Sequence, residues 1–131
     1  MLLFSRAKSL GGNVIKVLGI THINLVVANV DRSKAFYTAV FGLEEMFSPA
    51  PTLTFLKVSG TDNVIALQQG PDAPKTDKID HFGFQLAAEA DRESAVEEVV
   101  AAGGRFVERG SHGPGNPYVY VRDPDGYMIE L

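Results

Sequence analysis

The chain has no cysteine among its 131 residues. This absence excludes disulfide bonds, thiolate metal sites and cysteine nucleophiles. A net charge of −4 without any basic cluster leaves no electrostatic footprint for nucleic acid. No apolar run approaches the length of a membrane span, and the short apolar start, which Arg6 and Lys8 soon follow, lacks the form of a signal peptide. We therefore expect a cytoplasmic protein that binds neither nucleic acid nor membrane.

What the chain does have is an ordinary globular composition, with 45% hydrophobic and 21% charged residues. Its length suits one domain that buries roughly two-thirds of its unfolded surface. We expect this domain over residues 20–131, behind an N-terminal extension formed by residues 1–19.

One stretch occurs twice, first over residues 20–45 and again over residues 79–106. Each copy opens with Ile-x-His, continues with alternating apolar residues, and then has Asp-Arg, an amphipathic stretch and a glycine. His22 and His81 therefore fall at the same point of two copies. The repeat divides the domain into module one (20–69), a linker rich in Gly, Pro and charge (70–78) and module two (79–131).

The period of the apolar residues predicts the elements of each module. In module one we expect a helix that Asp31 caps and Gly42 ends. In module two we expect a helix over 91–102, with Val96, Val99 and Val100 facing inward. The expected strands cover residues 20–27, 52–58, 63–69, 79–86, 118–121 and 127–131. The fold class is therefore α+β, with two βαβββ modules in a pseudo-twofold repeat.

The repeat also aligns the last strands of the two modules and places Glu130 opposite Ala66. Of four equivalent positions, three then carry a side chain that binds metals, namely His22, His81 and Glu130. Two imidazoles and one carboxylate leave coordination positions open for water or substrate. Such a set suits a non-haem Fe(II) oxygenase, which we expect first, or a catalytic Mn²⁺, Zn²⁺ or Ni²⁺ site.

These motifs resemble the vicinal oxygen chelate superfamily, which includes glyoxalase I, bleomycin-resistance proteins, fosfomycin-resistance thiol transferases and extradiol dioxygenases. The resemblance covers residues 20–131, and its most specific motif is the closing stretch from Asp123 to Leu131. It implies two modules that form a U-shaped cleft around one divalent metal ion, with His22, His81 and Glu130 as its ligands. It also implies a small-molecule substrate and a homodimer.

Four further polar residues are candidates for the same site. Tyr120 precedes Glu130 by ten residues, as a tyrosine does in extradiol dioxygenases, and His112 lies in a glycine-rich loop where it could act as general acid or base. Asn24 and Gln68 share the strand faces of His22 and Ala66, where they could bind substrate. Each of the four also suits an ordinary packed or solvated position.

The residue at position 66 distinguishes between members of the superfamily. Glyoxalase I has a second glutamate there that is both ligand and proton handler, and an alanine can be neither. We therefore expect a metalloenzyme with dioxygenase-like chemistry first. Three alternatives stay open: a fosfomycin-resistance-type thiol transferase, a glyoxalase-type lyase or isomerase, and a bleomycin-resistance-type binding protein, a class that lacks the metal ligands.

Overall fold

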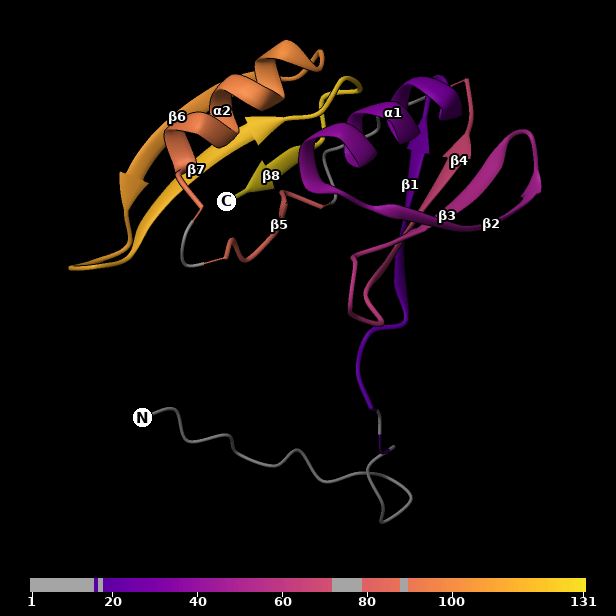
Figure 1. Cartoon of the computed structure of the whole chain (residues 1–131), viewed down its shortest axis with the longest axis horizontal. Coiled ribbons are helices and arrows are strands. Elements are labelled where there is room, and N and C mark those ends of the chain that lie inside the picture. The colour runs from indigo at the N-terminus through magenta and orange to yellow at the C-terminus, as the bar shows by residue number, and fades with distance from the viewer. Residues whose placement is uncertain (1–15, 17, 72–78, 88–89) are drawn as a thin grey trace.

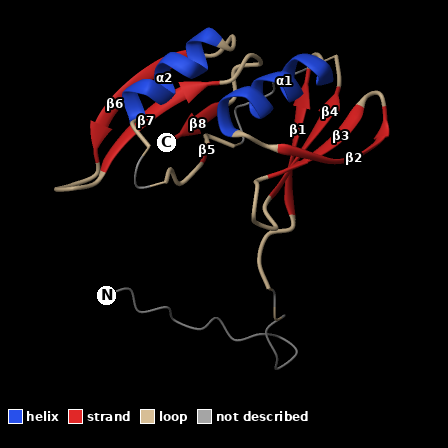
Figure 2. Cartoon of the chain, viewed as in Figure 1, coloured by secondary structure: helices blue, strands red, loops and turns tan. Residues whose placement is uncertain are grey.

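Both modules have the βαβββ order that the repeat predicts. The computed structural model describes every residue except 1–15, 17, 72–78 and 88–89. The N-terminal extension and the linker therefore lie mostly outside the described residues, and their boundaries stay predictions. Figures 1 and 2 show helices α1 and α2 on one side of the molecule, with the strands of both sheets beneath them. Within the described residues, no helix is long and apolar enough to cross a membrane.

Module one forms a four-stranded sheet in the order β1-β4-β3-β2, in which β1 and β4 are parallel. Its elements are β1 (His22–Val27), α1 (Val30–Phe41), β2 (Glu44–Ala50), β3 (Leu53–Lys57) and β4 (Val64–Gln69). Module two repeats this topology in the order β5-β8-β7-β6, with β5 and β8 parallel. Its elements are β5 (Phe82–Gly83), α2 (Arg92–Ala101), β6 (Arg105–Ser111), β7 (Pro117–Arg122) and β8 (Met128–Glu130).

The ends of α1 differ in part from the prediction. Asn29, not Asp31, is the N-cap, because its extended backbone lets the side-chain oxygen accept from the backbone N–H of Arg32 at 3.0 Å. Asp31 lies in the first turn, where a negative charge suits the helix dipole. Gly42 ends the helix as predicted, in the left-handed conformation at φ 68°.

Two predictions for module two are wrong in detail. The strand expected over 79–86 is confined to Phe82 and Gly83, because its partner β8 offers only three residues. On α2, Asp91 is the N-cap, and Val99 is fully buried as expected, but Val100 is 53% exposed. The helix contacts the core along one narrow stripe in which Val99 is central, and Val100 lies one residue away from it on the solvent side.

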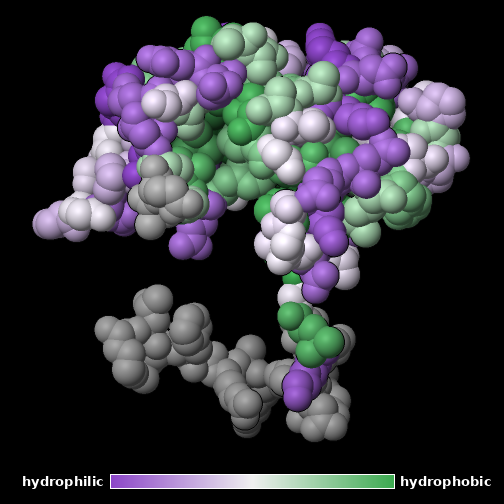
Figure 3. Space-filling model, in the orientation of Figure 1, coloured by the Kyte–Doolittle hydropathy of each residue, from purple (hydrophilic) through white to green (hydrophobic). Residues whose placement is uncertain are grey.

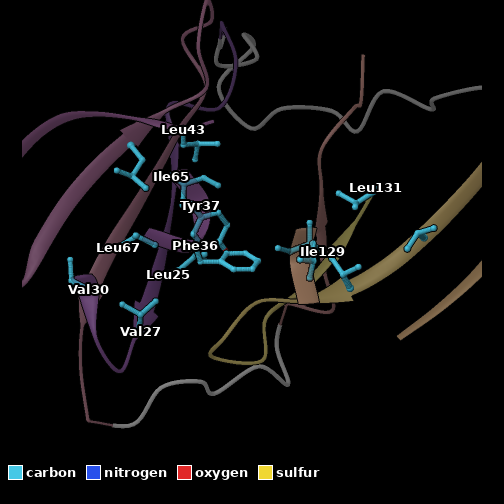
Figure 4. Packing of buried hydrophobic residues seen from close by; sticks show 14 residues of the cluster. Leu25, Val27, Val30, Phe36, Tyr37, Leu43, Ile65, Leu67, Ile129 and Leu131 are labelled. Atoms are coloured by element: carbon cyan, nitrogen blue, oxygen red, sulfur yellow. The ribbon is translucent and has the colours of Figure 1, made fainter. Parts of the chain in front are cut away.

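The two modules share one hydrophobic core. Phe36 and Tyr37 of α1 point across the junction toward Ile129 and Leu131, and all four are at most 5% exposed (Figure 4). Figure 3 shows apolar surface in the middle of the molecule, where the modules meet, and hydrophilic surface on the left over α2. Burial of the core side chains beneath it holds the modules together.

Buried hydrogen bonds fix the orientation of the two modules at this junction. The Asp125 carboxylate, in the turn before β8, accepts from the backbone N–H of Ala28 at 2.9 Å, from Ser33 Oγ at 2.9 Å and from Arg32 Nη2 at 2.7 Å. All three donors belong to module one. One nearly buried carboxylate thus fixes the start of α1 against the end of module two.

Asp123 and Tyr127 make the same connection from the same turn. The Tyr37 hydroxyl donates to Asp123 Oδ2 at 2.8 Å, and the Tyr127 hydroxyl donates to the Val26 carbonyl at 2.7 Å. Burial raises the pKa of Asp123, while its hydrogen bonds oppose that rise. Strand β1, which carries His22, and strand β8, which carries Glu130, are therefore tied to each other within one chain.

Asp125→Ala is expected to lower the free energy of unfolding by about 2–4 kcal/mol, because it leaves buried donors such as Ser33 Oγ without an acceptor. The corresponding fall in Tm is roughly 10 °C and can be followed by circular dichroism. Asp31→Ala is the matched control, since it removes a first-turn carboxylate that caps nothing, and it should change stability by less than about 0.5 kcal/mol. Equal stability of the two variants would contradict the role assigned to Asp125.

Candidate metal and substrate site

Both histidines of the repeat have one ring nitrogen held by the residue before them. The Nδ1 atom of His81 lies 2.7 Å from Asp80 Oδ2, and that of His22 lies 2.9 Å from Thr21 Oγ1. With Asp80 accepting from Nδ1–H, the neutral His81 ring carries its lone pair on Nε2, where a metal ion can bind. Sequence reasoning missed Thr21 and Asp80, although both occupy the x of Ile-x-His.

Three side chains of module two gather around the Glu130 carboxylate. His81 Nε2 lies 3.2 Å from Oε1, the Tyr120 hydroxyl donates to Oε1 at 3.0 Å, and His112 Nε2 lies 2.9 Å from Oε2. The hydrogen bond from His112 is the main cause that lowers the pKa of Glu130, and burial opposes it. Burial and the bond to Glu130 together raise the pKa of Tyr120. A carboxylate held in its anionic form suits a metal ligand.

The pair formed by His81 and Glu130 fits one metal ion. Two donor atoms, each roughly 2.0–2.2 Å from an ion and about 90–110° apart around it, lie roughly 2.9–3.5 Å from each other. The observed separation between His81 Nε2 and Glu130 Oε1 is 3.2 Å. The donor set is also of the right chemistry, since imidazole and carboxylate together suit Fe, Mn, Zn and Ni ions.

His22 does not join this pair within one chain. Among the described residues, no hydrogen bond or ion pair links it to His81 or Glu130, and no three His, Asp or Glu side chains there are arranged to hold a metal ion. His22 instead lines a cleft of about 670 Å³ between the modules, together with Ile23, Phe82 and other mostly apolar residues. Because that lining does not include His81 or Glu130, the cleft inside one chain is not the candidate metal site.

The strand registers confirm that Ala66 is the counterpart of Glu130. In module one Ala66 lies between Asn24 on β1 and Phe55 on β3, as Glu130 lies between Gly83 on β5 and Tyr120 on β7. Ala66 is 1% exposed and offers no ligand atom. The pseudo-twofold repeat thus offers three candidate ligand positions rather than four.

The remaining candidates lie beside these ligand positions. The Asn24 amide donates to Gln68 Oε1 at 2.9 Å, so the two predicted substrate-binding residues contact each other near His22. The His112 ring stacks on Tyr118 at 4.3 Å between centroids, and Tyr118 contacts Tyr120 edge to face at 5.1 Å. His112 is therefore held next to Glu130 and is not a free loop side chain. Tyr118 shares the strand face of Tyr120, and His112, Tyr118 and Tyr120 together form an aromatic wall beside Glu130.

Comparison with known proteins gives matches over most of this chain. A family model described as Glyoxalase/Bleomycin resistance protein/Dioxygenase superfamily matches residues 19–131. A probable lactoylglutathione lyase of Vibrio parahaemolyticus is 32% identical over 121 residues, which cover 86% of this chain and 88% of that protein. A manganese-dependent 2,3-dihydroxybiphenyl 1,2-dioxygenase of Geobacillus genomosp. 3 is 27% identical over 114 residues. That match covers 84% of this chain but only 35% of the dioxygenase.

Solved structures give the same fold. The crystal structure of a mutant of the fosfomycin resistance protein FosX from Listeria monocytogenes, in complex with Mn(II) and 1S,2S-dihydroxypropylphosphonic acid, has a TM-score of 0.75 to this chain. The two are 25% identical, and the match covers 88% of this chain and 90% of that one. The fosfomycin resistance protein from Mesorhizobium loti, at 22% identity and a TM-score of 0.72, is similar in fold.

Proposed function

This chain belongs to the Glyoxalase/Bleomycin resistance protein/Dioxygenase superfamily, and we propose that it is a divalent-metal enzyme whose ligands are His22, His81 and Glu130. A small substrate would bind the same ion through two adjacent oxygen atoms. The observation that carries this proposal is the gathering of His81, Tyr120 and His112 around the Glu130 carboxylate, with His81 Nε2 at a ligand-pair separation of 3.2 Å.

We propose dioxygenase-like chemistry as the first candidate reaction. When bound, Fe(II) or Mn(II) would polarise the substrate oxygens and activate dioxygen. The chain supplies the proton handling, since His112 lies where it can take the proton of a substrate hydroxyl and Tyr120 can donate a hydrogen bond to a substrate oxygen. The dihydroxybiphenyl dioxygenase relative, described as manganese-dependent, supports this choice. Zn²⁺ and Ni²⁺ remain the other proposed ions.

The second candidate is a metal-assisted addition of the fosfomycin-resistance type, with a thiol as the nucleophile. Its support is the likeness in fold to FosX, whose crystals hold Mn(II) and a vicinal diol. A two-histidine, one-glutamate set would serve either reaction, because both need open positions on the ion.

We also propose that the site is completed in a homodimer, with His22 contributed by a second copy of the chain. Two features support this arrangement. Among the described residues no hydrogen bond or ion pair joins His22 to Glu130, and the bonds from Asp125 and Tyr127 to module one hold β1 and β8 in their present relation. A second copy can bring its own His22 to Glu130 without breaking these bonds. The cytoplasmic location stays a prediction.

The test of the first candidate is oxygen uptake. Protein reconstituted under nitrogen with Fe(II) or Mn(II) is expected to consume dioxygen when a vicinal diol or hydroxyketone substrate is added from a panel. Glu130→Gln is the control, because it keeps the shape of the side chain but lacks the anionic charge, and it should bind little metal and consume no dioxygen. Metal-loaded protein that consumes no dioxygen but adds a thiol to an epoxide would move the proposal to the second candidate.

A glyoxalase reaction is expected to be absent, despite the relative named as a probable lactoylglutathione lyase. The buried Ala66 supplies neither the fourth ligand nor the base of that reaction. With added Ni²⁺ or Zn²⁺, the hemithioacetal of methylglyoxal and glutathione should not be isomerised, as followed by ultraviolet absorbance of the thioester product. Robust turnover would instead point to Gln68, or to a residue of a second copy, as the base.

A further inference from the structure

A mostly apolar cleft of about 670 Å³ lies between the two modules. Nine of its fourteen lining residues are apolar, and contact of such a surface with solvent is unfavourable. On the side of module two, Phe82 and Phe84 meet edge to face at 5.9 Å between centroids, and Phe84 stacks on Phe41 of α1 at 4.5 Å. Because an exposed apolar surface of this kind is typical of an interaction site, the cleft indicates an apolar partner.

The chain enters the fold at this cleft. Ile20 lines the cleft although it is 80% exposed, and Leu18, two residues earlier, is fully exposed. In Figure 1 the described chain enters β1 at its lower end, beside the turn that joins β3 to β4. Thr61 and Asn63 of that turn also line the cleft. The residues that precede Ile20 therefore begin at the edge of the cleft.

Residues 1–15 lie outside the described residues, and their sequence is suited to the cleft. Eight of the fifteen are apolar, and four of these form an unbroken run over residues 1–4. Phe4 is sixteen positions before Ile20, and a chain of that length reaches at most about 55 Å. The apolar run can therefore reach the cleft from the point where the chain enters the fold. Tethering also raises its effective concentration there, to about the millimolar range for a short linker.

Charge favours this segment over a second copy of the folded domain as the occupant of the cleft. Residues 1–19 contain three basic residues and no acidic one. Because the whole chain has a net charge of −4, residues 20–131 carry a net charge of −7. Asp62, between two lining residues of the β3–β4 turn, and Asp80, close to the start of β5, are both exposed. A basic segment meets these carboxylates with opposite charge, whereas a second copy of the acidic domain brings like charge.

We propose that residues 1–15 dock into the cleft between the modules of their own chain. The apolar run at residues 1–4 would pack against Phe82 and Phe84, and Arg6 with Lys8 would lie near the exposed carboxylates at the edge of the cleft. The docked segment would contact both modules and would shield the cleft from solvent and from other molecules. This docking goes beyond the proposed function and needs no metal ion.

The absence of cysteine allows a test on the full chain. Ser5→Cys introduces one thiol for a nitroxide label, whose unpaired electron broadens the amide NMR signals of nearby residues in metal-free, ¹⁵N-labelled protein. The signals of Val64 and of residues 82–84, which line the cleft, should be broadened. The signals of Arg105 and Phe106 should not, because β6 is the edge strand of the second sheet that lies farthest from β5.

Substitutions within the segment should release the label from the cleft. Leu3→Asp together with Phe4→Asp should lower the docked population about tenfold or more, since burial of each apolar side chain contributes roughly that factor. Arg6→Glu together with Lys8→Glu should lower it about two- to fivefold, because exposed ion pairs contribute little. Leu18→Asp is the matched control. Leu18 is fully exposed and does not line the cleft, so this variant should keep the broadening.

A mixed sample identifies the chain that supplies the segment. Nitroxide-labelled protein without ¹⁵N is mixed with ¹⁵N protein that carries no nitroxide and is left to exchange subunits, and no broadening of the cleft signals is expected. Broadening there would assign the cleft to the segment of a second copy and overturn docking within one chain. Absence of broadening at the cleft in the first sample, or its persistence in the Leu3→Asp, Phe4→Asp variant, would also overturn the proposal. Unchanged signals of the buried Val99 show that each variant is folded.

Discussion

Mixing the His22→Ala and Glu130→Ala variants is expected to restore the metal binding that each lacks alone. Each single variant removes one of the three proposed ligands and should bind metal about 100-fold more weakly or worse. In the proposed arrangement, His22 of one copy would meet His81 and Glu130 of the other, so a mixed dimer would have one complete site of its two. The mixed dimer, isolated through both tags, should therefore recover about half of the wild-type sites, and the unselected random mixture about a quarter.

The matched control is a mixture of His81→Ala with Glu130→Ala. Both ligands lie in module two, so no pairing of these two variants builds a complete site, and metal content should stay low. The variants are co-expressed with different affinity tags, and metal is measured on the doubly selected dimer. If the first mixture recovers no more metal than the control, the site does not draw His22 from a second copy.

The reason to expect this result lies in the junction between the modules. To bring His22 to Glu130 within one chain, β1 would have to move relative to β8. Such a movement would break the bonds of Asp125 to Ala28 and of Tyr127 to Val26, and would expose the shared core. Breaking one buried, charged hydrogen-bond network alone costs about 3–5 kcal/mol. A second copy avoids that cost.

Much of the fold could be predicted because its signals are local. Alternation identified β1, with Leu25 and Val27 buried, and a glycine that can adopt φ 68° marked the end of α1. The strands β2 and β6 were not assigned, because most of their residues are exposed and a bulge breaks the register of each. The N-cap of α1 is Asn29 rather than the predicted Asp31. Both residue types are good caps and they lie two positions apart, so the sequence alone does not show where the helix begins.

The candidate site was harder to predict than the fold, because most of its contacts join residues that are far apart in the sequence. The repeat predicts that Ala66 is the counterpart of Glu130, and the strand registers confirm it. It does not reveal that His112 contacts Glu130. The two residues are eighteen positions apart, and their contact depends on how the tip of the β6–β7 hairpin lies against β8. Nor does it reveal whether His22 and Glu130 of one chain meet, because that depends on how the modules dock.

Tyr120→Phe is expected to lower turnover about 10- to 1000-fold, in line with loss of one positioned hydrogen-bond donor. Within the part of the chain that the structure describes, the Tyr120 hydroxyl bonds only to Glu130 Oε1, at 3.0 Å, and its side chain is partly exposed. Once Oε1 binds the ion, the hydroxyl is free to donate to a substrate oxygen. The change removes a single oxygen atom, so metal content and Tm should remain close to those of the wild type.

Tyr118→Phe is the control for this variant. Tyr118 belongs to the same aromatic wall, but among the described residues its hydroxyl is not hydrogen-bonded to Glu130. It should leave turnover within about threefold of the wild type. Two results would contradict the role of Tyr120 in substrate binding. A loss of metal affinity that matches the loss of turnover would mean that Tyr120 only orients Glu130. A fall in stability of about 1 kcal/mol or more, with turnover per folded molecule preserved, would mean that its hydroxyl serves folding.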